Sequence, residues 1–147
     1  MNKIFEGDCI ESMKLMADKS VNCCVTSPPY FGLRDYGHEG QIGAEETPEA
    51  FVAKLVEVFR EVKRVLRDDG TLWLNLGDTY WGGGWRGAVF NEKSGDMQKG
   101  SKGTYGGENI KNATGKHDLY KSKDLIGIPW MVAFALRSDG WYLRQDI

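Results

Sequence analysis

Residues 47–77 read TPEAFVAKLVEVFREVKRVLRDDGTLWLNLG, and this stretch joins a helical pattern to a strand pattern. Thr47 is a good N-cap because its hydroxyl can accept a backbone N–H, and Pro48 suits the first helical position. The apolar residues that follow recur every three or four positions, which predicts one buried helical stripe: Phe51, Leu55, Val58, Val62 and Leu66. Asp69 and Gly70 predict a turn, after which TLWLNLG predicts a strand over 71–77.

The rest of the ordered pattern continues this alternation of strands and helices. The expected elements are a short strand at 3–7 (KIFEG), a helix at 9–17 (CIESMKLMA), a buried parallel strand at 20–26 (SVNCCVT), a helix from near Pro129 and a last strand at 141–147 (WYLRQDI). Inward contacts of the later helix are expected from Trp130, Ala133, Phe134 and Leu136. The pattern predicts a single α/β domain over residues 1–147, with a mainly parallel sheet and flanking helices.

The composition is typical of a globular protein, with 41% apolar and 27% charged residues among 147. No apolar run approaches the roughly 20 residues that span a bilayer, and the first residues lack the apolar core of a signal peptide. We therefore expect a cytoplasmic protein without membrane contact. The three cysteines, Cys9, Cys23 and Cys24, lack the spacing of zinc ligands, so we expect reduced thiols and no metal site.

The periodic pattern disappears between about residues 81 and 121, which we call the 81–121 insert. Ten glycines fall between Gly82 and Gly115, interleaved with basic and aromatic side chains. Such a segment can neutralise phosphates with its lysines and arginines and stack its aromatics on exposed bases. The residues expected to make such contacts are Trp81, Trp85, Arg86 and Lys102, together with Arg34. A flexible, solvated surface loop without a partner is the alternative interpretation.

The residues that follow the apolar strand at 20–26 are Ser27, Pro28, Pro29 and Tyr30. In open α/β sheets, ligands collect at the carboxyl ends of strands. Two consecutive prolines offer carbonyl acceptors without N–H donors, and each stiffens its predecessor in an extended conformation. The segment suits a planar ligand with an amino group, which donates to the Ser27 hydroxyl and the Pro28 carbonyl while its ring stacks on Tyr30. A strand-to-loop corner without a ligand, and a polyproline segment, are the alternatives.

The motif Ser27-Pro28-Pro29-Tyr30 resembles the catalytic motif of the amino-group DNA methyltransferases. Further segments resemble that family in the same order: EGDCIESM (6–13), FGLRDYG (31–37), LRDDGTLWLNLGDTYWGG (66–83) and ALRSDGWYLRQDI (135–147). The resemblance implies a partial Rossmann-like fold, S-adenosyl-L-methionine as cofactor and double-stranded DNA as substrate. It also implies transfer of a methyl group to the exocyclic nitrogen of a flipped base, with cytosine N4 favoured over adenine N6 for the serine form of the motif.

The resemblance assigns roles to individual residues. Ser27, Pro28, Pro29 and Tyr30 form the catalytic corner, and Phe31 stands beside Tyr30 as a second aromatic placed to receive the base. The cofactor is expected to contact Asp8, Cys9, Ser27 and Pro28. For Asp8, capping of the helix that follows is an alternative role. The thiols receive no catalytic role, because direct transfer needs no covalent intermediate with the enzyme.

The chain departs from the family pattern in one respect. The glycine-rich cofactor loop of the Phe-x-Gly-x-Gly type has no match here, and in enzymes with this motif order that loop lies toward the C-terminus. We therefore expect this chain to be the N-terminal catalytic part of a longer or split enzyme, with the loop supplied by a C-terminal half. The alternatives are a catalytically incomplete nucleic-acid-binding fragment and an RNA amino-methyltransferase.

Overall fold

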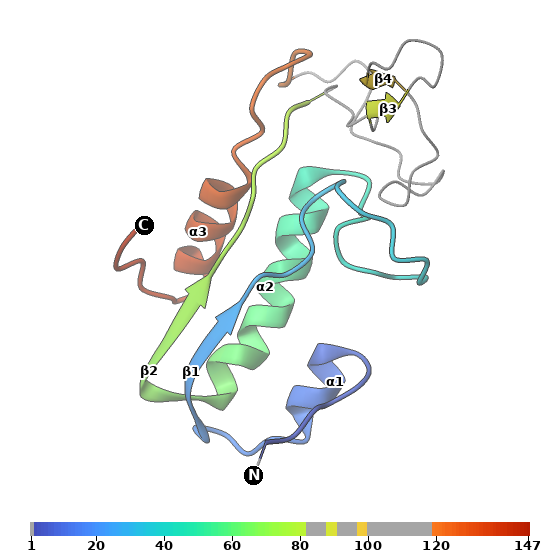
Figure 1. The fold of residues 1–147 in the computed structure, drawn as a ribbon. Helices are drawn as coiled ribbons and strands as arrows, with labels where there is room; N and C mark the ends of the chain where they lie inside the picture. Colours follow the sequence, from blue (N-terminus) through green and yellow to red (C-terminus); the bar gives the residue numbers. More distant parts are fainter. Residues whose placement is uncertain (1, 82–87, 91–96, 100–118) are drawn as a thin grey trace.

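The computed structural model describes residues 2–81, 88–90, 97–99 and 119–147 (Figure 1). Within these ranges the main body contains α1 (Cys9–Lys14), β1 (Val21–Thr26), α2 (Pro48–Val65), β2 (Leu66–Leu74) and α3 (Ile128–Ser138). An antiparallel pair, β3 (Ala88–Phe90) with β4 (Met97–Lys99), lies within the 81–121 insert. The combination of helices with a parallel strand pair confirms the predicted α/β class.

The strands β1 and β2 pair in parallel, as the sequence predicts. Their register shifts between Val21, which is opposite Leu66, and Cys23, which is opposite Thr71. Residues 67–70 of β2 therefore stand opposite the single residue Asn22 of β1, and this is where the sequence predicts a turn. Gly70 is needed there, because a Cβ at this position would lie 2.9 Å from the Arg67 carbonyl oxygen. The predicted turn is thus an irregularity inside a longer strand.

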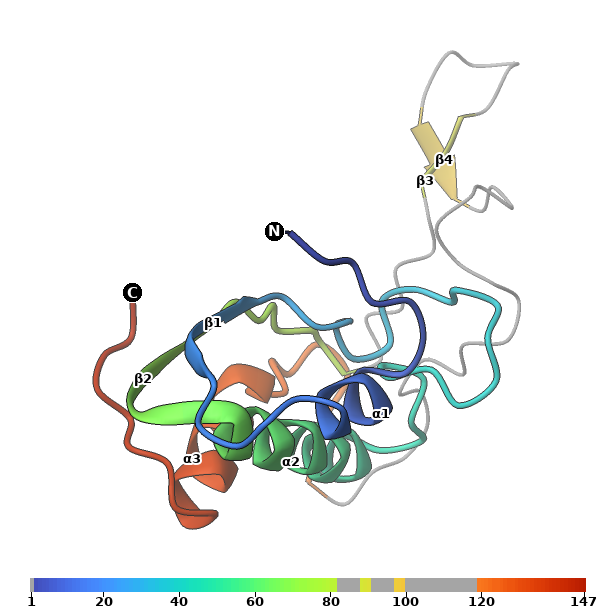
Figure 2. The ribbon, with the colours of Figure 1, turned by 90° about the horizontal axis from the view of Figure 1, so that it is seen from below.

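The helix α2 forms the centre of the core and agrees with the sequence prediction. The Thr47 side chain accepts a hydrogen bond from the Ala50 N–H at 3.1 Å, which is the expected N-cap. Phe51 and Leu55 are fully buried, and every member of the predicted apolar stripe is buried. α3 and α1 pack against α2. In Figure 2 the helices lie on one side of the strand pair.

Three sequence predictions about the sheet are wrong. Neither residues 3–7 nor residues 141–147 form a strand. The strand β1 is not buried, since Val25 is 78% exposed. The physical reason is that helices cover one face only, and among the described residues β1 pairs with β2 alone.

The inward face of α3 also differs from the prediction. Ile128, Val132 and Leu136, which recur every four residues, are buried. Trp130 and Phe134 are 49% and 48% exposed, because they sit half a turn away from that stripe. Of the predicted contacts, only Leu136 is fully buried and Ala133 is half-buried.

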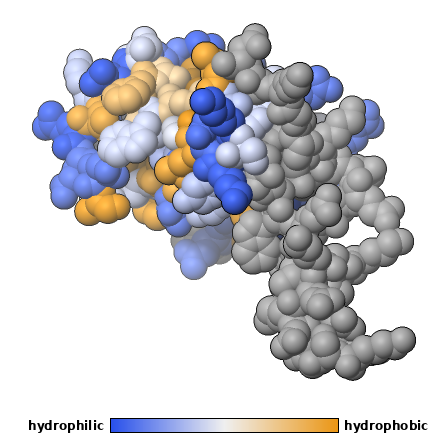
Figure 3. Space-filling model, turned by 90° about the horizontal axis from the view of Figure 1, so that it is seen from above, coloured by the Kyte–Doolittle hydropathy of each residue, from blue (hydrophilic) through white to orange (hydrophobic). Residues whose placement is uncertain are grey.

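The surface of the described residues mixes hydrophilic and hydrophobic side chains, as Figure 3 shows for one face. Several large apolar side chains are more than half exposed, among them Ile4, Leu15, Val25, Trp73 and Tyr142. None of the helices in the described ranges has the length and apolar character of a membrane span.

A bidentate ion pair ties α2 to the end of α3 and gives the fold a predictable acid dependence. Arg60 Nη2 lies 2.6 Å from Asp139 Oδ1, and Arg60 Nε lies 3.1 Å from Asp139 Oδ2. The hydrogen bond from Arg60 lowers the pKa of the Asp139 carboxyl below its ordinary value. A carboxyl whose pKa is lower in the folded state contributes stability above the unfolded pKa of about 3.9, and the contribution is lost as the pH falls through the folded value.

We therefore expect Asp139→Asn to lower the free energy of unfolding at pH 7 and to have a smaller effect at pH 2. Urea denaturation of both proteins at the two pH values measures this difference. Asp146→Asn, which changes an exposed aspartate near the end of the chain, is the control. An equal loss at both pH values would assign the effect to packing instead of charge.

Candidate functional site

The Ser27–Tyr30 corner lies at the carboxyl end of β1, as the sequence predicts. The Asn75 N–H donates to the Thr26 carbonyl at 2.9 Å, which keeps β2 beside β1 up to the first residue of the corner. Ser27 is exposed, and the two prolines and Tyr30 are half-buried. No hydrogen bond between described residues occupies the Pro28 carbonyl. The corner therefore presents a hydroxyl and a carbonyl acceptor to an incoming group.

The Tyr30 ring lies against the end of β2. A Cβ built on Gly77 would lie 2.6 Å from Tyr30 Cε2 and 2.8 Å from Cδ2, so only a glycine leaves room for the ring. Gly77 has no positive φ that would itself require glycine. On the other side, the Ser27 hydroxyl donates to the Tyr30 hydroxyl at 3.4 Å. The ring is thus placed between Ser27 and the Gly77 backbone, which follows β2.

The loop after Tyr30 folds back and supports it. Gly32 N–H donates to the Gly43 carbonyl at 2.8 Å, and Gly43 has φ +98°, which favours glycine. A Cβ on Gly43 would lie 2.8 Å from the Tyr30 carbonyl oxygen. Phe31 is 3% exposed and its ring centroid is 5.6 Å from that of Phe51 in the core. The expectation that Phe31 receives a base is therefore wrong, because its ring is already packed inside.

Asp78, which the sequence reasoning did not single out, connects β2 to α3. Its carboxylate accepts the backbone N–H groups of Gly127 and Ile128, each at 3.0 Å, and of Thr79 at 2.8 Å. Gly127 is the N-cap position of α3 and has no side chain to cap the helix. Asp78 therefore supplies the cap from a strand end 49 residues earlier. The only signal in the sequence was an acidic residue directly after a strand.

Replacement of Asp78 by alanine is expected to lower the free energy of unfolding by about 1–3 kcal/mol, because partly buried N–H groups at the start of α3 lose their acceptor. Asp78→Asn keeps one acceptor oxygen and should lose less. Urea denaturation of the two variants and the parent chain measures the difference. Equal stability of all three proteins would show that water replaces the carboxylate without cost.

Asp8 and Cys9 begin α1. The Asp8 carboxylate accepts the Glu11 N–H at 3.0 Å, which confirms the alternative capping role, and its side chain is exposed. Partial burial, and then the negative charge of Asp8, raise the pKa of the Cys9 thiol, so the thiol stays protonated at neutral pH. Between the described residues, no hydrogen bond or ion pair joins Asp8 to the Ser27–Tyr30 corner.

The base of the 81–121 insert is closed by an antiparallel contact. Tyr80 forms a bridge with Leu125, and Trp81 exchanges backbone hydrogen bonds of 2.8 and 2.7 Å with Asp124 and Lys123. Trp81 is 7% exposed and stacks on Tyr120 with ring centroids 5.3 Å apart. Its ring is part of the core, which does not fit the predicted role in stacking on a base.

The other residues expected to contact DNA differ in whether the structure describes them. Arg34 lies on the loop after the corner, is exposed, and accepts a hydrogen bond from Gln41 Nε2 at its carbonyl. Trp85, Arg86 and Lys102 lie outside the described residues.

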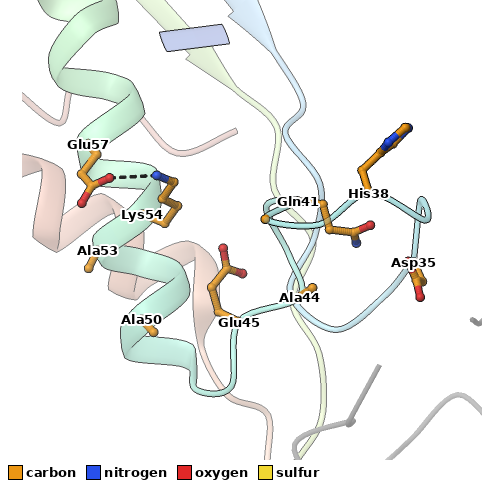
Figure 4. Close-up of a pocket in the computed structure, with 10 residues that line it drawn as sticks. Asp35, His38, Gln41, Ala44, Glu45, Ala50, Ala53, Lys54 and Glu57 are labelled. Atoms are coloured by element: carbon orange, nitrogen blue, oxygen red, sulfur yellow. Dashed lines mark hydrogen bonds and ion pairs between the residues drawn. The ribbon is translucent and has the colours of Figure 1, made fainter. Parts of the chain in front are cut away.

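A cavity of about 720 Å³ lies between this loop and the first half of α2 (Figure 4). The polar side chains among its lining residues are Asp35, His38, Gln41, Glu45, Lys54 and Glu57. Lys54 and Glu57 form an ion pair of 3.0 Å on the exposed side of α2. The cavity does not include the Ser27–Tyr30 corner. Within the described ranges no group of three or more His, Cys, Asp or Glu side chains could hold a metal ion.

Comparison with known proteins shows the family to which the chain belongs. Residues 21–147 match the DNA methylase family N6_N4_Mtase, and the chain belongs to this family. Methyltransferases of this family take the methyl group from S-adenosyl-L-methionine. The resemblance seen in the sequence is thereby confirmed at the level of the family.

Several curated relatives are Type II methyltransferases. M.SmaI of Serratia marcescens is 48% identical over 145 residues, which cover 99% of this chain and 46% of the relative. M.Cfr9I of Citrobacter freundii is 47% identical, with coverage of 98% and 44%, and M.SfiI of Streptomyces fimbriatus is 37% identical, with coverage of 97% and 28%. The chain thus spans less than half the length of these relatives. No solved structure gives a significant match.

Proposed function

We propose that this chain is the catalytic part of a site-specific DNA methyltransferase that modifies the exocyclic amino group of a flipped base, cytosine N4 in preference to adenine N6. The observation that carries the proposal is the Ser27–Tyr30 corner, with a free carbonyl acceptor and an aromatic ring at the end of a parallel strand. Membership of the DNA methylase family supports it. A cytoplasmic location and a role in restriction–modification belong to the same proposal.

The proposed chemistry depends on hydrogen-bond acceptors. The amino nitrogen of a base is a poor nucleophile because its lone pair is delocalised into the ring. The Ser27 hydroxyl and the Pro28 carbonyl accept hydrogen bonds from its two N–H groups and thereby localise the lone pair on nitrogen. Ser27 now donates to Tyr30 at 3.4 Å, a long bond that a hydroxyl rotation can exchange for acceptance. Tyr30 holds the base by stacking, which is worth about 1–3 kcal/mol.

S-Adenosyl-L-methionine supplies, when bound, an electrophilic methyl group on a sulfonium centre. The residues present fit part of this molecule, because the exposed carboxylate of Asp8 and the acceptors of Ser27 and Pro28 suit hydroxyl, amino and cationic groups. The backbone and thiol of Cys9 stand next to Asp8 as a further contact. A glycine-rich strand-to-helix loop is missing from the sequence, and a C-terminal half is proposed to supply it and to complete a Rossmann-like fold.

In this proposal the residues of this chain act by positioning the two reacting groups. Holding the amino nitrogen and the methyl carbon in line and close together can lower a barrier by about 7–11 kcal/mol in favourable systems. On the DNA side, Arg34, Trp85, Arg86 and Lys102 are proposed to contact the duplex. The Trp81 ring is buried, so it is not proposed to stack on a base.

Gly77 gives a specific test of the role of Tyr30. Gly77→Ala introduces a Cβ where the ring now lies, and no backbone strain accompanies it, so the ring must move while the fold remains. We expect methyl transfer to lose about 1–3 kcal/mol of base stacking. In a Tyr30→Ala background, Gly77→Ala should have no further effect, because the ring that it displaces is absent.

Initial rates for the four proteins of this double-mutant cycle, together with their melting temperatures, give the measurement. Independent, additive losses would show that Gly77 does not act through Tyr30. A melting temperature that falls with Gly77→Ala in both backgrounds would assign the effect to stability.

The reaction itself is tested by incubating the chain with unmethylated DNA and labelled S-adenosyl-L-methionine and separating the digested nucleosides by mass. N4-methylcytosine establishes the reaction and the base together, and N6-methyladenine would correct the base. A product that forms only after the remaining part of a relative is added would make the chain an incomplete catalytic part. No product in either case, with DNA still bound, would favour the nucleic-acid-binding fragment, and modification of RNA alone would favour an RNA enzyme.

A further inference from the structure

The loop that follows the Ser27–Tyr30 corner is anchored on that corner. It spans residues 31–46, between the end of β1 and the start of α2 (Figure 1). Its two ends meet where the Gly32 N–H donates to the Gly43 carbonyl at 2.8 Å, and Gly43 lies against the backbone of Tyr30. Residues 33–41, which we call the loop tip, therefore extend from a stem that contacts the corner directly.

One side chain holds the loop tip in shape. Gln41 Oε1 accepts the Tyr36 N–H at 2.7 Å, and Gln41 Nε2 donates to the Arg34 carbonyl at 2.8 Å. The Asp35 carboxylate accepts the Gly37 N–H at 2.7 Å, which closes a turn at the same place. Both ends of the Gln41 amide are thus bound to the backbone on either side of Asp35. Hydrogen bonds within the loop therefore fix the conformation of the tip.

The loop tip nevertheless keeps an aromatic ring and an aliphatic side chain in solvent. Tyr36 is 50% exposed and Leu33 is 39% exposed. Among the described residues the Tyr36 side chain takes part in no hydrogen bond, ion pair or ring contact. A backbone that is fixed in advance removes the entropy cost of ordering it on binding. The ring is therefore presented in a form that suits contact with a partner.

The proposed function supplies such a partner. A base that leaves a duplex to enter the corner loses its pairing and stacking and leaves a gap in the base stack. Apolar side chains inserted between base steps occupy such gaps, and aromatic rings stack on the bases beside them. Tyr36 follows Tyr30 by six residues, and six residues of chain span at most about 22 Å. The ring is therefore within reach of a duplex whose base occupies the corner.

We propose that the loop tip enters the duplex beside the target base and that the Tyr36 ring fills the space that this base leaves, with Leu33 as a second apolar contact. The inference rests on the proposed function, because it requires a flipped base. It adds a positioning residue, which holds the flipped state without contacting the base that is methylated. Gln41 acts through the backbone of Tyr36 by keeping the ring at the tip.

The charge of the loop tip distinguishes this role from phosphate binding. The tip carries one arginine, Arg34, and two carboxylates, Asp35 and Glu39. Its net charge does not favour the DNA backbone, so its contribution is expected to come from the base stack. Removing the Tyr36 ring should therefore leave the salt dependence of DNA binding unchanged.

The test measures base flipping and methyl transfer on duplex DNA in which the methylated base has been located. The enzyme is this chain, with the remaining part of a relative where transfer requires it. Pyrrolocytosine, or 2-aminopurine if the target is adenine, replaces the target base and brightens when it leaves the stack. Tyr36→Ala is expected to lower the transfer rate on the fully paired duplex at least about tenfold, as for one lost base–aromatic stack, and to reduce the rise in fluorescence.

Two control variants and a second DNA make this result specific. Tyr36→Phe keeps the ring and should behave as the parent. Tyr142→Ala removes a tyrosine that is 86% exposed and lies outside the loop, and should also behave as the parent. A duplex with a pyrene nucleotide opposite the target base has the gap already filled and the base pushed out. On this DNA, Tyr36→Ala should transfer methyl groups at the parent rate.

The outcomes separate this inference from the proposed function. Parent-like transfer and fluorescence by Tyr36→Ala on the fully paired duplex would overturn the inference and leave the function standing. An equal loss on the pyrene duplex, which a defect in folding or cofactor binding would give, would overturn it as well. No methylated base in DNA treated with the parent enzyme would contradict the proposed function, and the role of Tyr36 with it.

Discussion

Methyl transfer by the complete enzyme is expected to fall about 10²–10³-fold when Ser27 is replaced by alanine, the loss seen when one preorganised hydrogen-bond partner of a reacting group is removed. The Ser27 hydroxyl is one of two acceptors that the corner offers to an amino group. Its side chain is exposed and bonds only at 3.4 Å to Tyr30 among the described residues, so the fold should remain intact. Initial rates at saturating DNA and cofactor measure the effect.

Two further variants make this result specific. Ser20→Ala removes an exposed hydroxyl that donates to the Ala17 carbonyl at 2.6 Å, away from the corner, and should transfer at the parent rate. Tyr30→Phe keeps the ring and removes only the hydroxyl that Ser27 now contacts, so most of the activity should remain. A Ser27→Ala enzyme with the parent rate would remove the hydroxyl from the proposed mechanism.

Replacing Phe51 by alanine is expected to lower the free energy of unfolding by about 3–5 kcal/mol, the usual cost of deleting a buried phenylalanine ring. Phe51 is fully buried on α2, and its ring contacts that of Phe31, the residue after Tyr30. The cavity would therefore open directly behind the Ser27–Tyr30 corner. Urea denaturation measures the stability, and the activity remaining at low temperature shows how far the corner has moved.

Phe134→Ala is the matched control for this variant. The Phe134 side chain is 48% exposed, with the Arg137 guanidinium 5.1 Å from the ring centroid. Its removal should cost about 1 kcal/mol or less. A loss below about 1 kcal/mol for Phe51→Ala as well would mean that the core collapses around the missing ring.

The sequence predicted best where the signal was local. The N-cap at Thr47, the apolar stripe of α2 and the strand at 21–26 depend on residues a few positions apart, and each has the predicted conformation. The position of the Ser27–Tyr30 corner followed from that strand. The motif at 27–30 indicated the family because its residue types are unusual after an apolar strand.

Long-range features could not be predicted in the same way. Residues 3–7 and 141–147 have strand-like side chains, but a strand also needs a neighbouring edge, and none reaches them among the described residues. The Asp78 cap joins positions 49 residues apart. Trp81 looked like an exposed aromatic of a polar insert, and its burial depends on Tyr120 at the far end of that insert.

The antiparallel contact of Tyr80 with Leu125 has a consequence for how such enzymes can diversify. The chain leaves the domain and returns to it at adjacent points, held by the backbone bonds between Thr79 and Ile126 and between Trp81 and Asp124. Doubling the length of a flexible closed loop costs only about 0.6 kcal/mol. A change in the length of the intervening stretch is therefore expected to cost little stability, as long as these backbone bonds are kept.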